Sequence, residues 1–165
     1  TQWSSSAASD VYKRQLHTND APSTITRLQN MGTPDYLISA ACQLVLAQRL
    51  ARRSCKDCRV PDDDVTPKVL QDLGFSPEQA SRVKALKGKG CAKCKDSGYK
   101  GRQGIYEILV VSKPVKEAIL RKATTPELRQ IAIKEGFQTM QDMGRRLIAN
   151  GELNFREYER VLASE

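Results

Sequence analysis

Four cysteines in two closely spaced pairs limit what this chain can fold into more than any other feature. Cys55 and Cys58 form one CxxC pair, Cys91 and Cys94 form another, and 32 residues separate the pairs. Each pair lets two thiolates converge on one metal ion about 2.3 Å away, and two pairs complete a closed tetrahedral site with no position left for water. The spacing therefore predicts a structural zinc site with these four cysteines as ligands.

Three other uses of the cysteine pairs fit the sequence less well. Disulfides within each pair would close strained four-residue rings and would suit an oxidising compartment that nothing else here indicates. A redox dithiol usually has a single CxxC. An iron–sulfur cluster also takes four cysteines, but the long gap is more typical of zinc modules. The fifth cysteine, Cys42, lies among Ile38, Ala41 and Val45 and is expected to be a small buried apolar residue.

The chain divides into four segments by its sequence texture. Residues 1–15 are polar, rich in Ser and Ala, and are expected to be a disordered or non-native leader. Because the chain begins with Thr rather than Met, we expect it to have been cut from a longer protein. Residues 16–54 contain two helical patterns and a third apolar run, residues 55–104 hold the cysteine pairs, and residues 105–165 read as a strand followed by helices.

Capping and turn residues predict most of the elements. Ser23 is expected to cap a helix over 24–31, and Pro34 to open another through about Cys42. The run 43–53 is ambiguous between helix and strand, although the even spacing of its leucines favours a strand. Residues 104–111 predict a strand. Further helices are expected after Thr66 and Ser76, over 113–122, after Thr125, around Met140–Ile148 and after Asn154.

Composition excludes several classes of protein. The longest apolar stretch, from Tyr36 to Ala47, is too short to cross a bilayer, and no secretory signal is visible. The sequence contains neither GxxxxGK[ST] nor GxGxxG. With a single histidine, His17, any scheme that needs two imidazoles is ruled out.

The formal charge of +8 invites a nucleic-acid or membrane-surface function. Basic residues gather around the second CxxC pair: Lys84, Lys87, Lys89, Lys93, Lys95, Lys100 and Arg102. Aromatic residues make up only 5% of the chain, so stacking platforms for nucleic acid are scarce. Four thiolates and one Zn²⁺ would lower the net charge to about +6, which removes much of the support for nucleic-acid binding.

Three strings closely resemble one family: LHTNDAPSTITRLQNMG, LVLAQRLARRSCKDC and GCAKCKDSGYKGRQGIYEIL. They are similar to the C-terminal part of the ATPases that power type IV pilus assembly and type II secretion, over residues 16–165. The resemblance implies an α/β fold. Residues 16–54 would be the remnant of a RecA-like P-loop NTPase domain lacking its phosphate loop, residues 55–104 a tetracysteine zinc module, and residues 105–165 a strand with a helical C-terminal bundle.

The resemblance also implies a function for a longer parent protein. Such proteins are hexameric, cytoplasmic motors, peripheral to the inner membrane, that bind ATP and Mg²⁺ and work with an inner-membrane platform protein. LHTND is similar to the family's His box, which gives His17 a catalytic place near the terminal phosphate of ATP. The zinc module, with Cys55, Cys58, Cys91 and Cys94 as ligands, is implicated in coupling to the platform protein.

Two departures from the family pattern matter. The phosphate loop (Walker A), the Asp box and Walker B are all absent, so the chain alone is not expected to bind or hydrolyse ATP. The apolar strand expected before LHTND is replaced by SSAASDVYKRQ. The alternative to a motor fragment is a stand-alone zinc-ribbon module that binds an anionic partner such as nucleic acid. The low aromatic content and the helical tail disfavour this alternative.

Overall fold

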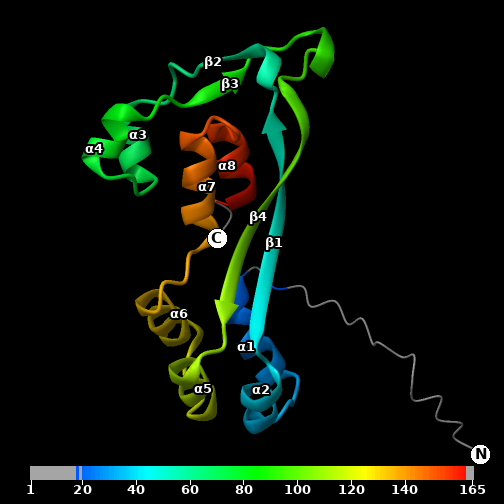
Figure 1. Cartoon of the computed structure of the whole chain (residues 1–165), viewed down its shortest axis with the longest axis vertical. Coiled ribbons are helices and arrows are strands. Elements are labelled where there is room, and N and C mark those ends of the chain that lie inside the picture. Colours follow the sequence, from blue (N-terminus) through cyan, green and yellow to red (C-terminus); the bar gives the residue numbers. More distant parts are fainter. Residues whose placement is uncertain (1–17, 19, 163–165) are drawn as a thin grey trace, which may run out of the picture.

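A long two-stranded antiparallel ribbon organises the molecule. The computed structural model describes residue 18 and residues 20–162, and it combines helices and strands. Strand β1 (Leu44–Ser54) pairs with β4 (Tyr99–Val110) from Leu44 opposite Val110 to Ser54 opposite Tyr99. The register shifts once, between Arg52 and Ser54. The ribbon runs the length of the molecule in Figure 1 and joins the segments 16–54 and 105–165 in one sheet.

Helices lie along the ribbon. Figure 1 shows α1, α2, α5 and α6 at its lower end and α7 and α8 beside its upper half. Their bounds are Ala21–Asn30 (α1), Asp35–Ala41 (α2), Lys113–Leu120 (α5), Thr125–Lys134 (α6), Met140–Ala149 (α7) and Phe155–Leu162 (α8). Helices and ribbon share one apolar core, whose fully buried members include Ile25, Ile105, Ile119, Leu128 and Ile148.

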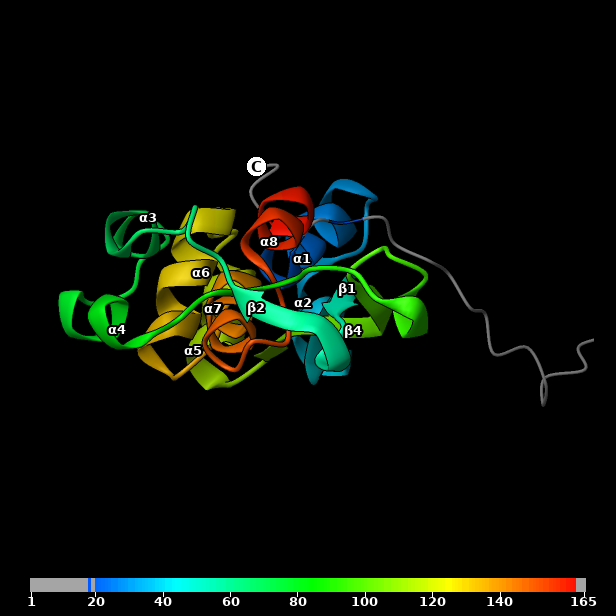
Figure 2. The same cartoon turned by 90° about the horizontal axis from the view of Figure 1, so that it is seen from above.

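The chain between β1 and β4 forms an arm at the upper end of the ribbon. Its short pieces are η1 (Lys56–Cys58), β2 (Arg59–Pro61), α3 (Pro67–Asp72), α4 (Pro77–Arg82), β3 (Leu86–Gly88) and η2 (Ala92–Cys94). Strands β2 and β3 pair antiparallel and carry the α3–α4 hairpin away from the ribbon, as Figures 1 and 2 show. Both helices start at the expected caps, since Thr66 accepts from the N–H of Val69 and Ser76 forms a capping box with Gln79.

The two faces of the ribbon differ sharply. On β1 the odd positions Val45, Ala47 and Ala51 are buried under the helices. On the opposite face, large apolar side chains at even positions of both strands are exposed. They are Leu44, Leu46 and Leu50 on β1 and Tyr106, Ile108 and Val110 on β4. Strand alternation, which places successive side chains on opposite faces, produces this separation.

A buried carboxylate fastens two helices to the ribbon. Glu107 points from β4 into the core and is only 2% exposed. One of its oxygens accepts a hydrogen bond from the N–H of Ala21, the first residue of α1, and the other accepts from the N–H of Met140, the first residue of α7, at 3.1 Å. Burial raises the pKa of Glu107, and the two N–H donors counteract that rise.

Several sequence expectations need correction. The cap of α1 is Asp20, which accepts from the N–H of Ser23 at 2.8 Å, so this helix begins three residues earlier than expected. Strand β4 begins five residues earlier than expected, at Tyr99. The strand alternative for 43–53 is confirmed as β1, whereas β2 and β3 were not expected. Cys42 is only partly buried, against the edge of the core.

No helix within the described part of the chain is both long and apolar enough to cross a bilayer.

Candidate metal centre

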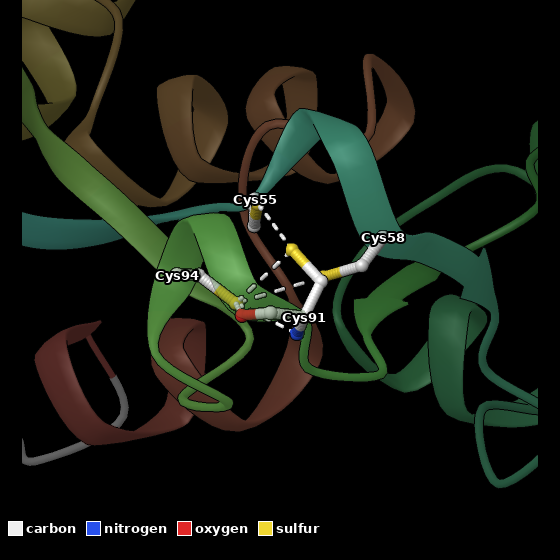
Figure 3. A group of neighbouring side chains, drawn as sticks. All are labelled: Cys55, Cys58, Cys91 and Cys94. Carbon is white, nitrogen blue, oxygen red and sulfur yellow. Dashed lines mark hydrogen bonds between the residues drawn. The ribbon is translucent and has the colours of Figure 1, made fainter.

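The four cysteines meet where the arm leaves the ribbon. Cys55 directly follows β1 and Cys58 ends η1, while Cys91 precedes η2 and Cys94 ends it. Each CxxC pair thus surrounds a single turn of 3₁₀ helix, which brings the two thiols of a pair to the same side. Figure 3 shows the four side chains pointing toward one another, and their sulfur atoms all lie within 4.8 Å of each other.

The sulfur spacing matches a tetrahedral metal site. With zinc–sulfur bonds of about 2.3 Å, neighbouring sulfurs of a tetrahedron are about 3.8 Å apart. The observed Sγ–Sγ distances are 3.9 Å for Cys55–Cys91, 3.9 Å for Cys58–Cys94 and 3.6 Å for Cys91–Cys94. All four cysteines are free thiols, and a disulfide would need sulfurs about 2.05 Å apart. The residues present therefore fit a four-coordinate metal ion.

Backbone N–H groups supply the local electrostatics of the site. The N–H of Cys91 and the N–H of Gly98 donate to Sγ of Cys94 at 3.2 and 3.3 Å. Burial alone would raise the pKa of Cys94, but these donors, together with hydrogen bonds from the Cys91 and Cys58 thiols, outweigh it and lower the pKa to about 7. Burial and the neighbouring thiols raise the pKa of Cys58 to about 12. A metal ion would have to displace that proton, since the thiolate is the ligand.

Glycines let the backbone close around the cysteines. A Cβ on Gly98 would lie 2.5 Å from the carbonyl oxygen of Gly88, and one on Gly88 would lie 2.0 Å from the carbonyl oxygen of Gly98. Gly98 also has φ of +74°, a conformation that residues with a Cβ rarely adopt. The N–H of Cys55 donates to the carbonyl of Gly98 at 2.9 Å, which ties the first cysteine pair to the loop after the second.

The basic residues around the second pair are partly neutralised. Lys93 forms an ion pair with Asp57 at 2.6 Å, and Lys87 pairs with Asp62 at 2.7 Å and Asp64 at 3.1 Å. The groups that lower the pKa of Cys94 are the backbone N–H groups of Cys91 and Gly98 and the thiols of Cys91 and Cys58. The cluster is therefore a mixed surface, less basic than the sequence indicates.

Three arginines of β1 bind the C-terminal helix segment. Arg49 donates to the carbonyl of Val161 at 2.6 Å, Arg53 pairs with Glu152 at 3.0 Å, and Arg52 pairs with Glu157 at 2.7 Å. Glu157 was not predicted from the sequence, which indicates only a helix after Asn154; in the structure its side chain is fully buried.

His17 and the leader 1–15 lie outside the described residues, so the roles expected for them stay predictions. The next part of the LHTND string is described: Thr18 shares a hydrogen bond with Thr24 at 2.6 Å, and Asp20 caps α1.

Comparison with known proteins places this architecture in a family. The family described as Type II/IV secretion system protein matches residues 13–160. The type IV pilus assembly ATPase PilB of Myxococcus xanthus is 39% identical over 142 residues, which cover 86% of this chain and 25% of PilB. PilB of Thermus thermophilus is 42% identical over 132 residues, covering 78% of this chain and 14% of that protein.

Relatives from type II secretion match as well. The type II secretion system protein HxcR of Pseudomonas aeruginosa is 34% identical over 146 residues, covering 88% of this chain and 27% of HxcR. The chain thus spans about a quarter, or less, of the length of these relatives. The family match covers most of the chain, the cysteine pairs included. The chain is therefore a member of the Type II/IV secretion system protein family.

Proposed function

We propose that this chain is the zinc-bearing C-terminal part of an ATPase that powers type IV pilus assembly or type II secretion. The observation that carries the proposal is the agreement between the family match over 13–160 and a tetracysteine cluster with tetrahedral spacing inside that match. The relatives compared above are named as pilus assembly ATPases and a type II secretion protein.

Zinc is the proposed metal. Four thiolates in a closed tetrahedron are the usual ligands of structural zinc, which adds folding free energy and leaves no open position for chemistry. Cys55, Cys58, Cys91 and Cys94 would hold it, and the N–H groups of Cys91 and Gly98 would orient the Cys94 thiolate. The role of the ion is to fix the arm to the end of the ribbon.

The motor activity belongs, in this proposal, to the longer protein. Residues 16–54 are the end of its RecA-like domain, with His17 as a catalytic residue near the terminal phosphate of ATP. The phosphate loop and Walker B, which would hold ATP and Mg²⁺, lie in no part of this sequence. The assembled motor is a cytoplasmic homohexamer at the inner membrane, and the zinc module couples it to its platform-protein partner. A stand-alone nucleic-acid-binding module is not favoured, because acidic side chains pair with part of its basic cluster.

Two experiments test the proposal. Metal analysis of purified protein should give one zinc per chain, and Cys55→Ser should abolish stoichiometric binding; a folded protein without metal would contradict the zinc assignment. In the second experiment, residues 16–160 of this chain replace the matching part of M. xanthus PilB. Pilus assembly by this chimera, and its loss in a Cys55→Ser chimera, would support the function. A stable chimera that cannot assemble pili, in a strain that wild-type PilB complements, would count against it.

A further inference from the structure

The segment before the first cysteine pair and the loop after the second are both attached to the C-terminal helix region. The N–H of Ser54, next to Cys55, donates to the carbonyl of Glu152 at 2.9 Å. On the other side, the hydroxyl of Tyr99, next to Gly98, accepts from Asn154 at 2.9 Å. These contacts link residues flanking the metal ligands to the turn that leads into α8.

Glu157 is the central contact of this attachment. Its side chain is fully buried on α8, and its oxygens accept from the N–H, Nε and Nη2 of Arg52 at 2.7, 2.9 and 2.7 Å. Arg160 of the same helix also donates to the Glu157 carboxylate. The backbone N–H of Glu157 donates to Oδ1 of Asn154 at 2.8 Å. The guanidinium of Arg52 also lies over the ring of Tyr99, 4.2 Å from its centroid.

Arg52 lies three residues before the first cysteine, at an irregular point of the ribbon. Arg52 and Ser54 flank the register shift between β1 and β4, where Ser54 comes to lie opposite Tyr99. Ladder pairing is interrupted there, so the neighbouring contacts of Cys55 with the Gly98 carbonyl and with the other sulfurs hold the strand ends together. A bound ion that joins Cys55 to Cys94 therefore also fixes Arg52 and Tyr99 against Glu157.

We propose that Glu157 is a positioning residue of the metal centre and that metal affinity and the docking of α8 are coupled. The inference rests on the proposed metal site and goes beyond it. Coupling between binding and docking is reciprocal: if the ion strengthens the contacts of Glu157, those contacts strengthen metal binding by the same factor. Groups that hydrogen-bond directly to metal ligands typically change affinity by about 10- to 100-fold, so Glu157, one contact further out, should act at the lower end of that range. Glu157 acts through Arg52 and the strand end, without touching the ion.

The first test measures zinc affinity by chelator competition. Glu157→Gln should weaken zinc binding about tenfold, the lower end of that range, while Glu159→Gln, an exposed position on the same helix, should not. Because Glu157→Gln could impair folding, Arg52→Gln is the second variant, and Arg102→Gln, its cross-strand neighbour, is the matched control. Unchanged affinity in both Glu157→Gln and Arg52→Gln would overturn the proposal.

The second test follows amide hydrogen exchange of the wild-type protein with zinc and after chelation. Protection of α8 should fall on chelation, whereas α5, at the opposite end of the ribbon in Figure 1, should keep its protection. Unchanged protection of α8, or equal loss in α5 and α8, would overturn the coupling. If wild-type protein binds no zinc, the metal site and the coupling both fail; if it binds zinc and the variants bind it equally well, only the coupling fails.

Discussion

Glu107→Gln should destabilise the fold more than any other single polar substitution in the lower half of the ribbon. Asp20 and Thr139 cap α1 and α7, but each serves the N–H at the third helical position. The first N–H of each helix, from Ala21 and Met140, depends on Glu107 instead, one on each carboxylate oxygen. Glutamine offers a single acceptor oxygen, so one of the two N–H groups would face an amide NH₂ and lose its partner.

The magnitude follows from the burial of these groups. A buried donor without a partner costs about 1–3 kcal/mol, and replacing a charged acceptor by a neutral one weakens the remaining hydrogen bond by about 1 kcal/mol. Loss of a negative charge at two helix N-termini removes up to about 1 kcal/mol for each helix. Relief from burying a charge offsets part of this, as the raised pKa of Glu107 indicates. We expect a net loss of about 2–3 kcal/mol.

The assay is urea unfolding at constant free zinc and pH 7.5, followed by circular dichroism. Glu117→Gln, an exposed carboxylate on α5, is the matched control and should change the free energy of unfolding by less than about 0.5 kcal/mol. A Glu107→Gln protein within about 0.5 kcal/mol of wild type would refute the reasoning, because two buried N–H donors would then not need the carboxylate.

Three further predictions concern the upper half of the ribbon. Burial alone would raise the pKa of Glu157, but hydrogen bonds from Arg160 and Arg52 lower it to about 2, from an ordinary value of 4.5; its stabilisation is therefore complete above about pH 4.5 and lost as pH falls toward 2. Because both arginine side chains are about half exposed, we expect this stabilisation to be only about 1–2 kcal/mol. It is measured as the difference in unfolding free energy between wild type and Glu157→Gln, which should shrink between pH 6 and pH 3. A difference that stays constant over this pH range would contradict the prediction. Gly98→Ala should weaken zinc binding, measured by chelator competition, because the added Cβ would meet Gly88. Gly101 has φ of +81° but open space around it, so Gly101→Ala should incur only the backbone penalty of about 1 kcal/mol. Equal effects of the two substitutions on zinc binding would show that the contact with Gly88 is unimportant. The 165-residue chain should bind no ATP in calorimetry, and measurable binding would contradict the need for a phosphate loop.

The ribbon shows how far sequence patterns reach. Even spacing of Leu44, Leu46 and Leu50 indicated the strand correctly, yet these leucines occupy the exposed face. The buried face carries Val45 and Ala47, whose small side chains let helices approach closely. Periodicity identifies a strand but cannot say which face is covered, because that depends on elements packed from elsewhere in the chain.

The cysteine cluster was predictable because its geometry is local. A CxxC pair brings two thiols together through one turn, so the spacing alone predicted the clustering of all four cysteines. The two buried carboxylates were not predicted, since their partners lie 86 and 105 residues away. For Glu107 a signal existed: in GIYEIL it alternates with Ile105 and Leu109, which places it on their inward face. Glu157 offered no such signal, because it lies in the first turn of a helix, where an exposed carboxylate is common.

The ribbon has a mechanical consequence. Eleven residues of extended strand make β1 roughly 35 Å long, with the cysteine cluster at one end and α1 and α2 near the other. A tilt of about 10° at the lower end would carry the cysteine cluster sideways by about 6 Å, provided the two strands stay straight. A small rotation of the helices at one end would thereby produce, at the other, a displacement longer than the rise of one helical turn, about 5.4 Å.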